Sequence, residues 1–164
     1  MDKKIGLFWL RDDFRVTKND GLIEATKNHE QVVVFYLYKK DIYKHQEAQK
    51  WWLSKSLTNF KKKLSSLNIS LEIIETNSFK IFFDKLLKKK DFKIYWNKVY
   101  EPDFLKFDEY LSNCLQSKNI FFKRHKGNAL DEIEEIKKND GTPFKVFTPF
   151  WRNAEKYYID KIPS

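Results

Sequence analysis

The stretch that decides the fold reads Lys4-Ile5-Gly6-Leu7-Phe8-Trp9-Leu10 and runs directly into Arg11-Asp12-Asp13-Phe14-Arg15. Its five apolar residues are interrupted only by Gly6, which predicts a strand buried on both faces. Four of the next five residues are charged, so the chain leaves the core there. A helix is predicted to follow from about residue 20. Strand, charged loop and helix open a βαβ unit, whose ligands bind where strands end, so we expect this loop to line a site.

The same alternation continues along the chain. Strands are predicted at residues 4–10, 31–37, 69–75, 93–96 and about 119–124, and helices at about 20–27, 47–67, after Asn77-Ser78 and from Pro102. Asp20 is the expected N-cap of the first helix. In the second helix one apolar stripe is expected, formed by Leu53, Leu57, Phe60, Leu64 and Leu67. The fold class predicted is α/β, a Rossmann-like, five-stranded, doubly wound parallel sheet of order 3-2-1-4-5.

The pattern changes after the fifth strand. Residues 127–138 are acidic and weakly apolar, and Asn139-Asp140-Gly141 is a turn signal. Thr148 and Pro149 fit an N-cap and a first helical residue, leading into an aromatic helix to about residue 158. We therefore predict an α/β domain over residues 1–126 and a connecting segment with an aromatic helix over 127–164, made to pack on a further domain.

Length and composition favour a single globular domain. The chain has 164 residues, of which 41% are hydrophobic and 34% charged, and no apolar run approaches the roughly 18 residues of a membrane span. Its single cysteine, Cys114, cannot form an internal disulfide, which fits a reducing cytoplasm. Because Cys114 falls near the apolar face of a predicted helix, we expect it to pack rather than to react.

The net charge of +9 leaves two interpretations open. One is attraction to nucleic acid or another polyanion. The other is a lysine-rich composition with solvated helix faces, since Lys61-Lys62-Lys63 and Lys88-Lys89-Lys90 lie at or near predicted helix ends, where cations suit the helix dipole.

No self-contained catalytic or metal-binding pattern is present in the sequence. It has neither a Gly-x-Gly-x-x-Gly nor a Gly-x-x-x-x-Gly-Lys motif, and its three histidines are scattered, so no metal site is expected. In a 3-2-1-4-5 sheet a crevice opens between strands 1 and 4. The side chains expected around it are Arg11, Asp12, Asp13, Asn97, Tyr100, Glu101 and Asp103, with Trp9, Tyr36 and Trp96 at strand ends. They suit a flat ligand with polar edges, such as a flavin or pterin, or are ordinary loop residues and core aromatics.

Four stretches, in order, resemble motifs of the DNA photolyase/cryptochrome family. They are Trp9-Leu10-Arg11-Asp12-Asp13-Phe14-Arg15 with Asn19 and Leu22, then Trp52-Leu53-x-x-Ser56-Leu57, then Tyr95-Trp96-Asn97 with Tyr100-Glu101-Pro102, and Asp140 to Trp151. The last matches the family's Gly-x-Pro-(Phe/Tyr)-Lys-Val-Phe-Thr-Pro-Phe segment almost letter for letter. Together the four motifs cover nearly the whole chain.

The resemblance implies the N-terminal domain of a deoxyribodipyrimidine photolyase, which repairs ultraviolet-induced pyrimidine dimers with light. In that family this α/β domain holds an antenna chromophore and passes excitation to FAD in a C-terminal helical domain, which also binds damaged DNA. The partner implied is therefore that helical domain. No catalytic residue is assigned to these 164 residues, and the chain alone is not expected to be an enzyme.

The resemblance implies an antenna site at Trp9, Arg11, Asp12, Tyr36, Trp96, Asn97, Tyr100, Glu101 and Asp103. The antennas that the resemblance implies are a deazaflavin, FMN or FAD, or methenyl-tetrahydrofolate, and the alternative of no antenna stays open. Folate-binding members often carry Asn-Glu where this chain has Asp103-Phe104, and this change removes an acceptor for the pterin donors. Two alternatives stay open: a blue-light receptor module of cryptochrome type, and a stand-alone nucleotide- or nucleic-acid-binding protein without catalysis.

Overall fold

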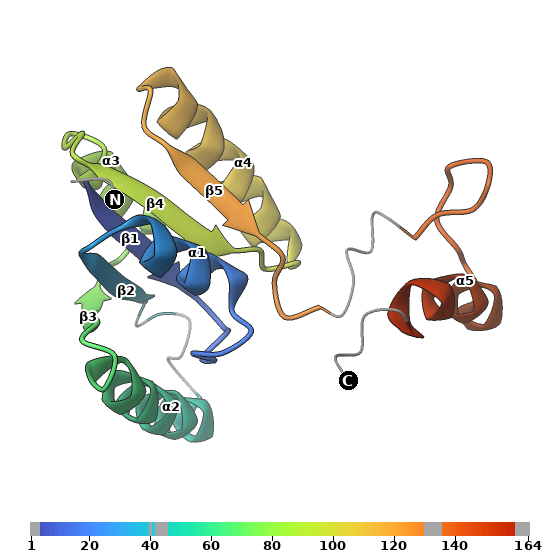
Figure 1. Ribbon diagram of the computed structural model, residues 1–164, viewed down its shortest axis with the longest axis horizontal. Helices are drawn as coiled ribbons and strands as arrows, with labels where there is room; N and C mark the ends of the chain where they lie inside the picture. Colours follow the sequence, from blue (N-terminus) through green and yellow to red (C-terminus); the bar gives the residue numbers. More distant parts are fainter. Residues whose placement is uncertain (1–3, 40, 42–45, 130–135, 160–164) are drawn as a thin grey trace. The chain divides into compact units, whose positions relative to one another are not determined.

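The computed structural model describes residues 4–39, 41, 46–129 and 136–159. It contains one five-stranded sheet (Figure 1) made of β1 (Ile5–Leu10), β2 (Val32–Tyr38), β3 (Ser70–Glu75), β4 (Phe92–Asn97) and β5 (Phe122–His125). All neighbouring strands are parallel and their order is β3-β2-β1-β4-β5. This confirms the predicted α/β class and strand order. β1 lies at the centre, where Trp9 pairs with Phe35 of β2 and Trp96 of β4.

Four helices connect the strands: α1 (Asp20–Asn28), α2 (Glu47–Ser65), α3 (Phe79–Leu86) and α4 (Pro102–Ser117). Two apolar clusters show which faces they cover. Buried residues of α1 and α2 pack with one set of strand side chains, and those of α3 and α4 pack with the other set. The central strands β1, β2 and β4 are therefore buried on both faces, as their continuous apolar sequences predict, whereas the edge strands β3 and β5 are partly exposed. Within the ranges that the structure describes, no helix is long and apolar enough to cross a membrane.

Some predicted element ends were wrong, each for a local reason. The N-cap of α1 is Asn19 rather than Asp20, because the Asn19 side chain accepts a hydrogen bond from the Leu22 amide at 3.2 Å. Leu67 is exposed because α2 ends at Ser65 and Asn68 turns the chain with a φ of 56°. β5 begins at Phe122 rather than near residue 119, because Asn119 still turns the chain out of α4 with a φ of 54°.

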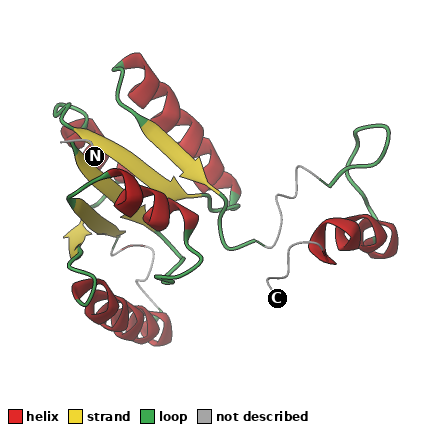
Figure 2. Cartoon of the chain, viewed as in Figure 1, coloured by secondary structure: helices red, strands yellow, loops and turns green. Residues whose placement is uncertain are grey.

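The chain divides into two compact units, Met1–Asn128 and Ala129–Ser164. Within the second unit, Gly141 adopts a φ of +78° in the predicted turn, and α5 (Phe147–Ile159) follows (Figure 2). The helix begins before the predicted cap Thr148, because the carbonyl of Val146 already accepts a hydrogen bond from the Phe150 amide. The acidic stretch predicted at 127–138 lies partly outside the described residues.

Candidate functional site

A hollow of about 670 Å³ lies at the carboxyl edge of the sheet. It is lined by the ends of β1 and β2, by the loop after β4 and by the first residues of α3 and α4. Six of the nine predicted site residues meet there: Trp9, Arg11, Asp12, Tyr36, Glu101 and Asp103. Arg11 and Glu101 therefore line one hollow although ninety positions separate them, because β1 and β4 are neighbouring parallel strands.

Aromatic rings form much of the apolar wall of this hollow. Trp9 packs edge-on against Phe79 of α3 at 5.5 Å and against Phe107 of α4 at 6.0 Å between ring centroids. Phe79 also lies 5.9 Å from Phe104. All four rings line the hollow, so flat apolar surface comes from β1, α3 and α4 together. Such a wall suits a planar ligand.

Arg11 is a buried cation at the wall of the hollow. Its Nη2 donates to both carboxylate oxygens of Asp108 at 2.8 Å, and the side chains are 5% and 0% exposed. The guanidinium carbon lies 4.4 Å from the centroid of the Trp9 ring and 5.6 Å from that of Phe104. Asp108 and the two rings therefore fix the guanidinium between α4 and β1.

Two nitrogen donors of the same guanidinium, Nε and Nη1, take no part in the ion pair with Asp108. Nε and Nη1 of Arg11 are buried and make no hydrogen bond to any group that the structure describes. Burial lowers the pKa of Arg11, and Asp108 opposes this shift. Buried donors without partners are uncommon in proteins, so these two can take an acceptor if a small shift of the side chain opens them to the hollow.

Carboxylates cluster on one side of the hollow. Asp12, Glu101 and Asp103 are all exposed there. Asp12 and Glu101 come from the loops after β1 and β4, and Asp103 from the first turn of α4. Partial burial raises the pKa of the Asp12 carboxyl, while Arg11 opposes the shift and Glu101 adds to it. These oxygens can accept hydrogen bonds from ring N–H groups or sugar hydroxyls.

Positive charge gathers on another side of the hollow. Ser78, Phe79 and Lys80 form the N-terminal end of α3, and Lys39 follows β2. The Lys39 ammonium lies 5.4 Å from the Phe79 ring centroid. A helix N-terminus with a nearby lysine is a favourable place for a phosphate group.

The structure places the other three predicted site residues outside the hollow. Trp96 is fully buried and stacks on Phe122 at 5.7 Å. Asn97 is buried on the α1 side, where its amide donates to Asn19 at 3.0 Å. The Tyr100 hydroxyl accepts a hydrogen bond from the Gly127 amide at 3.2 Å. Trp96 therefore joins β4 to β5, Asn97 joins β4 to the N-terminal end of α1, and Tyr100 joins the loops after these two strands.

Sequence reasoning did not identify several residues around the hollow: Lys39, Ser78, Phe79, Lys80, Phe104, Phe107 and the arginine partner Asp108. Apart from Tyr36 at the end of strand 2, the predicted residues come from the ends of strands 1 and 4 and the loops that follow them. The ends of strands 2 and 3 lie at the same edge of a parallel sheet, and this geometry could have pointed to Lys39 and Ser78.

The family model for DNA photolyase matches residues 6–164 of the chain. The chain belongs to this family. It is 27% identical to a deoxyribodipyrimidine photo-lyase of Agrobacterium fabrum over 91% of the chain and 31% of that protein. It is also 27% identical to cryptochrome-2 of Arabidopsis thaliana over 99% of the chain and 27% of that protein. The chain thus spans about a third or less of the length of these photolyase-family relatives.

Solved photolyase structures share the fold. A bacterial class III photolyase from Agrobacterium tumefaciens aligns with a TM-score of 0.81 and 25% identity over 94% of this chain and 32% of that one. An archaeal photolyase from Sulfolobus tokodaii, crystallised with two FAD molecules, aligns with a TM-score of 0.73 and 19% identity over 93% of this chain and 35% of that one. The α/β unit described above is the N-terminal domain fold of the photolyase family.

Proposed function

We propose that this chain is the antenna-holding domain of a deoxyribodipyrimidine photolyase and that the hollow at the sheet edge binds a flavin-type chromophore. The observation that carries the proposal is the composition of that one hollow: five aromatic side chains, a buried arginine with two unpaired donors, and groups of opposite charge. The antenna would supply light absorption and transfer of excitation, and the chain's own residues would supply rigid placement.

Each wall of the hollow fits one part of FMN or FAD. The half-buried rings of Phe79, Phe104 and Phe107, with the buried Trp9 behind them, suit the flat isoalloxazine. The unpaired donors of Arg11 suit its ring carbonyls. Lys39 and the N-terminus of α3 suit the phosphate. The carboxylates of Asp12 and Glu101 suit ribityl hydroxyls. A deazaflavin shares these features, whereas methenyl-tetrahydrofolate offers carboxylates instead of a phosphate.

The whole protein would use the chain as one of two parts. The relatives are about three times as long as the aligned region, which leaves room for a helical FAD domain. We propose that this second domain binds damaged DNA, and that the exposed Phe147 and Val146 of the second unit face it. We also propose that the chain divides into an α/β domain over 1–126 and a connecting segment over 127–164. A further part of the proposal is a cytoplasmic location, which agrees with the single cysteine.

Flavin binding to the purified chain tests the proposal. We expect FMN to bind with a dissociation constant in the range of about 1–50 μM. This is weaker than the limit of about 0.2 μM that a ceiling of roughly 0.3 kcal/mol for each of its ~31 non-hydrogen atoms would set, because the hollow is open on one side. Absorbance changes and quenched flavin fluorescence would report binding. Lys39→Ala should weaken FMN about fivefold or more by removing a charge near the phosphate, yet leave riboflavin binding unchanged.

Lys55→Ala, which removes a lysine on α2 away from the hollow, is the matched control and should leave both ligands unaffected. If none of FMN, FAD, a deazaflavin and methenyl-tetrahydrofolate binds at tens of micromolar, the hollow is not an antenna site. Equal effects of Lys39→Ala on FMN and riboflavin would contradict the assignment of the phosphate to the α3 end.

A further inference from the structure

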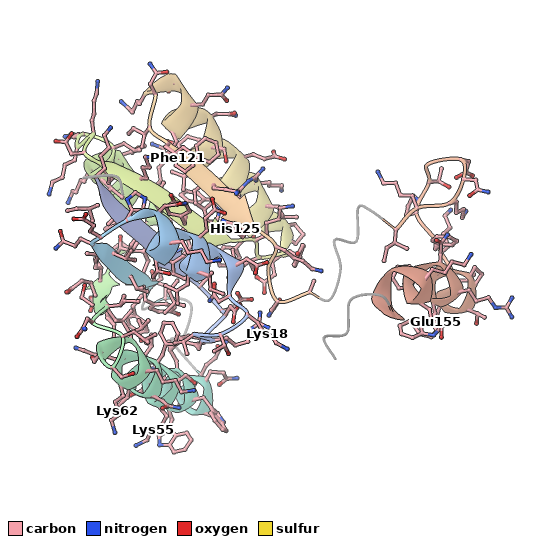
Figure 3. The ribbon with its side chains drawn as sticks, in the orientation of Figure 1. Lys18, Lys55, Lys62, Phe121, His125 and Glu155 are labelled. Carbon is pink, nitrogen blue, oxygen red and sulfur yellow. The ribbon has the colours of Figure 1, made fainter. Side chains whose placement is uncertain are left out.

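An aromatic and basic surface runs along the outer side of α2. Trp51, Lys55, Thr58 and Lys62 follow one another at spacings of four, three and four, so they share one side of the helix. That side is opposite the leucine and phenylalanine residues that α2 buries against the sheet. Figure 3 shows Lys55 and Lys62 directed away from the sheet. Trp52 lies about 100° further round the helix than Trp51, and its ring contacts that of Trp51. We call Trp51, Lys55 and Lys62, with the adjoining Trp52, the α2 stripe.

The two tryptophans of the α2 stripe are unusually exposed. Trp51 is 57% and Trp52 66% exposed, and their rings meet edge-on at 5.5 Å between centroids. The Lys55 ammonium lies 5.7 Å from the Trp51 ring centroid. Tryptophan is on average highly buried, so a neighbouring exposed pair marks a surface that gains by being covered.

The charged residues of α2 are nearly all positive. The helix carries five lysines and one acidic residue, Glu47, which pairs with Lys50 at 2.7 Å. Within the part of the chain that the structure describes, Lys55, Lys62 and Lys63 form no ion pair with a carboxylate. The covering partner must therefore bring negative charge together with flat apolar surface.

We propose that the α2 stripe binds single-stranded nucleic acid. Phosphates would lie against Lys55 and Lys62, and unpaired bases would stack on Trp51 and Trp52, the combination by which proteins hold single strands without reading sequence. From Trp51 to Lys62 the helix rises about 16 Å at 1.5 Å per residue, a length that a few consecutive phosphates span. A duplex keeps its bases stacked inside, so it would meet the lysines alone.

The α2 stripe is separate from the hollow at the sheet edge. None of its four residues lines that hollow, and none of the hollow's residues belongs to α2. Nucleic-acid binding by the α2 stripe therefore does not depend on the proposed antenna, and either proposal can fail without the other.

Charge reversal on the purified 164-residue chain is the first test. Fluorescence anisotropy would follow a labelled oligothymidylate of about 15 nucleotides, a length within the range of known single-strand sites. K55E/K62E should weaken binding at least about tenfold and reduce the slope of log affinity against log salt by about 1.4, since two phosphate contacts are lost. The matched control K88E/K89E reverses two exposed lysines after α3 and should change affinity by less than about threefold. If K88E/K89E lost as much affinity for oligothymidylate as K55E/K62E, binding would depend only on the overall positive charge of the chain, and the proposal would be overturned.

Removal of the rings is the second test. W51A/W52A should weaken oligothymidylate binding about fivefold or more per stacked base, and leave binding of inorganic polyphosphate unchanged because polyphosphate has no bases. The wild-type chain should also prefer the single strand to a duplex of the same length. Unchanged oligothymidylate binding in W51A/W52A, or no binding by the wild type at low salt, would overturn the proposal and leave the α2 stripe to a protein partner.

Discussion

At the residue scale, Arg11 shows how one side chain joins distant parts of the chain. The sequence left open whether it contacts a ligand or is an ordinary loop residue. The structure shows an ion pair with Asp108, ninety-seven positions away, and two buried donors left unpaired. Arg11 thus has a structural role, and the proposed function gives its remaining donors a ligand. A buried charge pair is costly to break because the surviving partner has lost its water.

Asp108→Asn is therefore expected to destabilise the protein strongly. The substitution keeps the shape of the side chain but removes the charge that balances Arg11, and the free energy of unfolding should fall by about 3–5 kcal/mol. Urea unfolding followed by circular dichroism measures it. The control Asp84→Asn breaks an exposed pair with Lys80 and should leave the unfolding midpoint unchanged. If both substitutions lowered the free energy of unfolding equally, the buried ion pair would contribute no more to stability than the exposed one.

At the element scale, α1 shows packing overriding helix propensity. Gly21 is buried in the first turn of α1, where an added Cβ would lie 2.5 Å from Asn97 Oδ1 and 2.8 Å from the Phe8 ring. Glycine is a poor helix former and alanine the best one, so propensity alone favours alanine by about 1 kcal/mol. α1 can approach β1 and β4 this closely only because residue 21 is a glycine and has no side chain.

Gly21→Ala should therefore destabilise the protein despite the better helix former. We expect the free energy of unfolding to fall by about 1–3 kcal/mol, because the new methyl group overpacks a buried contact. Asn59→Ala, on the exposed side of α2, is the control, and it should leave stability unchanged or raised. The midpoint temperatures of thermal unfolding of the two variants and the wild type measure these effects. A Gly21→Ala variant more stable than the wild type would show that α1 can move away from the sheet.

At the scale of the whole molecule, the first unit holds both apolar clusters of the sheet. All residues of these clusters lie between Leu7 and Phe122, inside Met1–Asn128. A domain that contains all residues of its hydrophobic core is expected to fold by itself. The second unit carries Phe147 and Val146 at 71% and 63% exposed, which fits a surface to be covered in a longer protein.

A chain cut after Asn128 should keep its fold. We expect cooperative urea unfolding with the midpoint of the full chain, measured by circular dichroism, because both clusters remain complete. A chain cut after Ser117 loses β5 together with Ile120, a buried member of one cluster, and should not unfold cooperatively. Loss of cooperativity in the longer fragment would mean that the second unit supports the sheet.

The sequence was sufficient for the fold and for part of the site. Apolar runs and their spacing gave every strand of the sheet and its order, because a parallel sheet buried on both faces needs continuous apolar strands. The loops after strands 1 and 4 were correctly placed together. Trp96 and Asn97 lie outside the hollow: Trp96 shares a face with Trp9 but is covered by Phe122 of the next strand, and Asn97 points to the opposite face, toward α1.

By itself the sequence determined the alternation of strands and helices, the 3-2-1-4-5 order and the family, since these depend on local patterning and on motifs of neighbouring residues. Only the tertiary structure decided that Asp108 balances Arg11, that Lys39 and the start of α3 complete the hollow, and that Trp51 and Trp52 face outward with unpaired lysines. The physical reason is that burial and ion pairing depend on how close residues far apart in the sequence come when helices pack on a sheet.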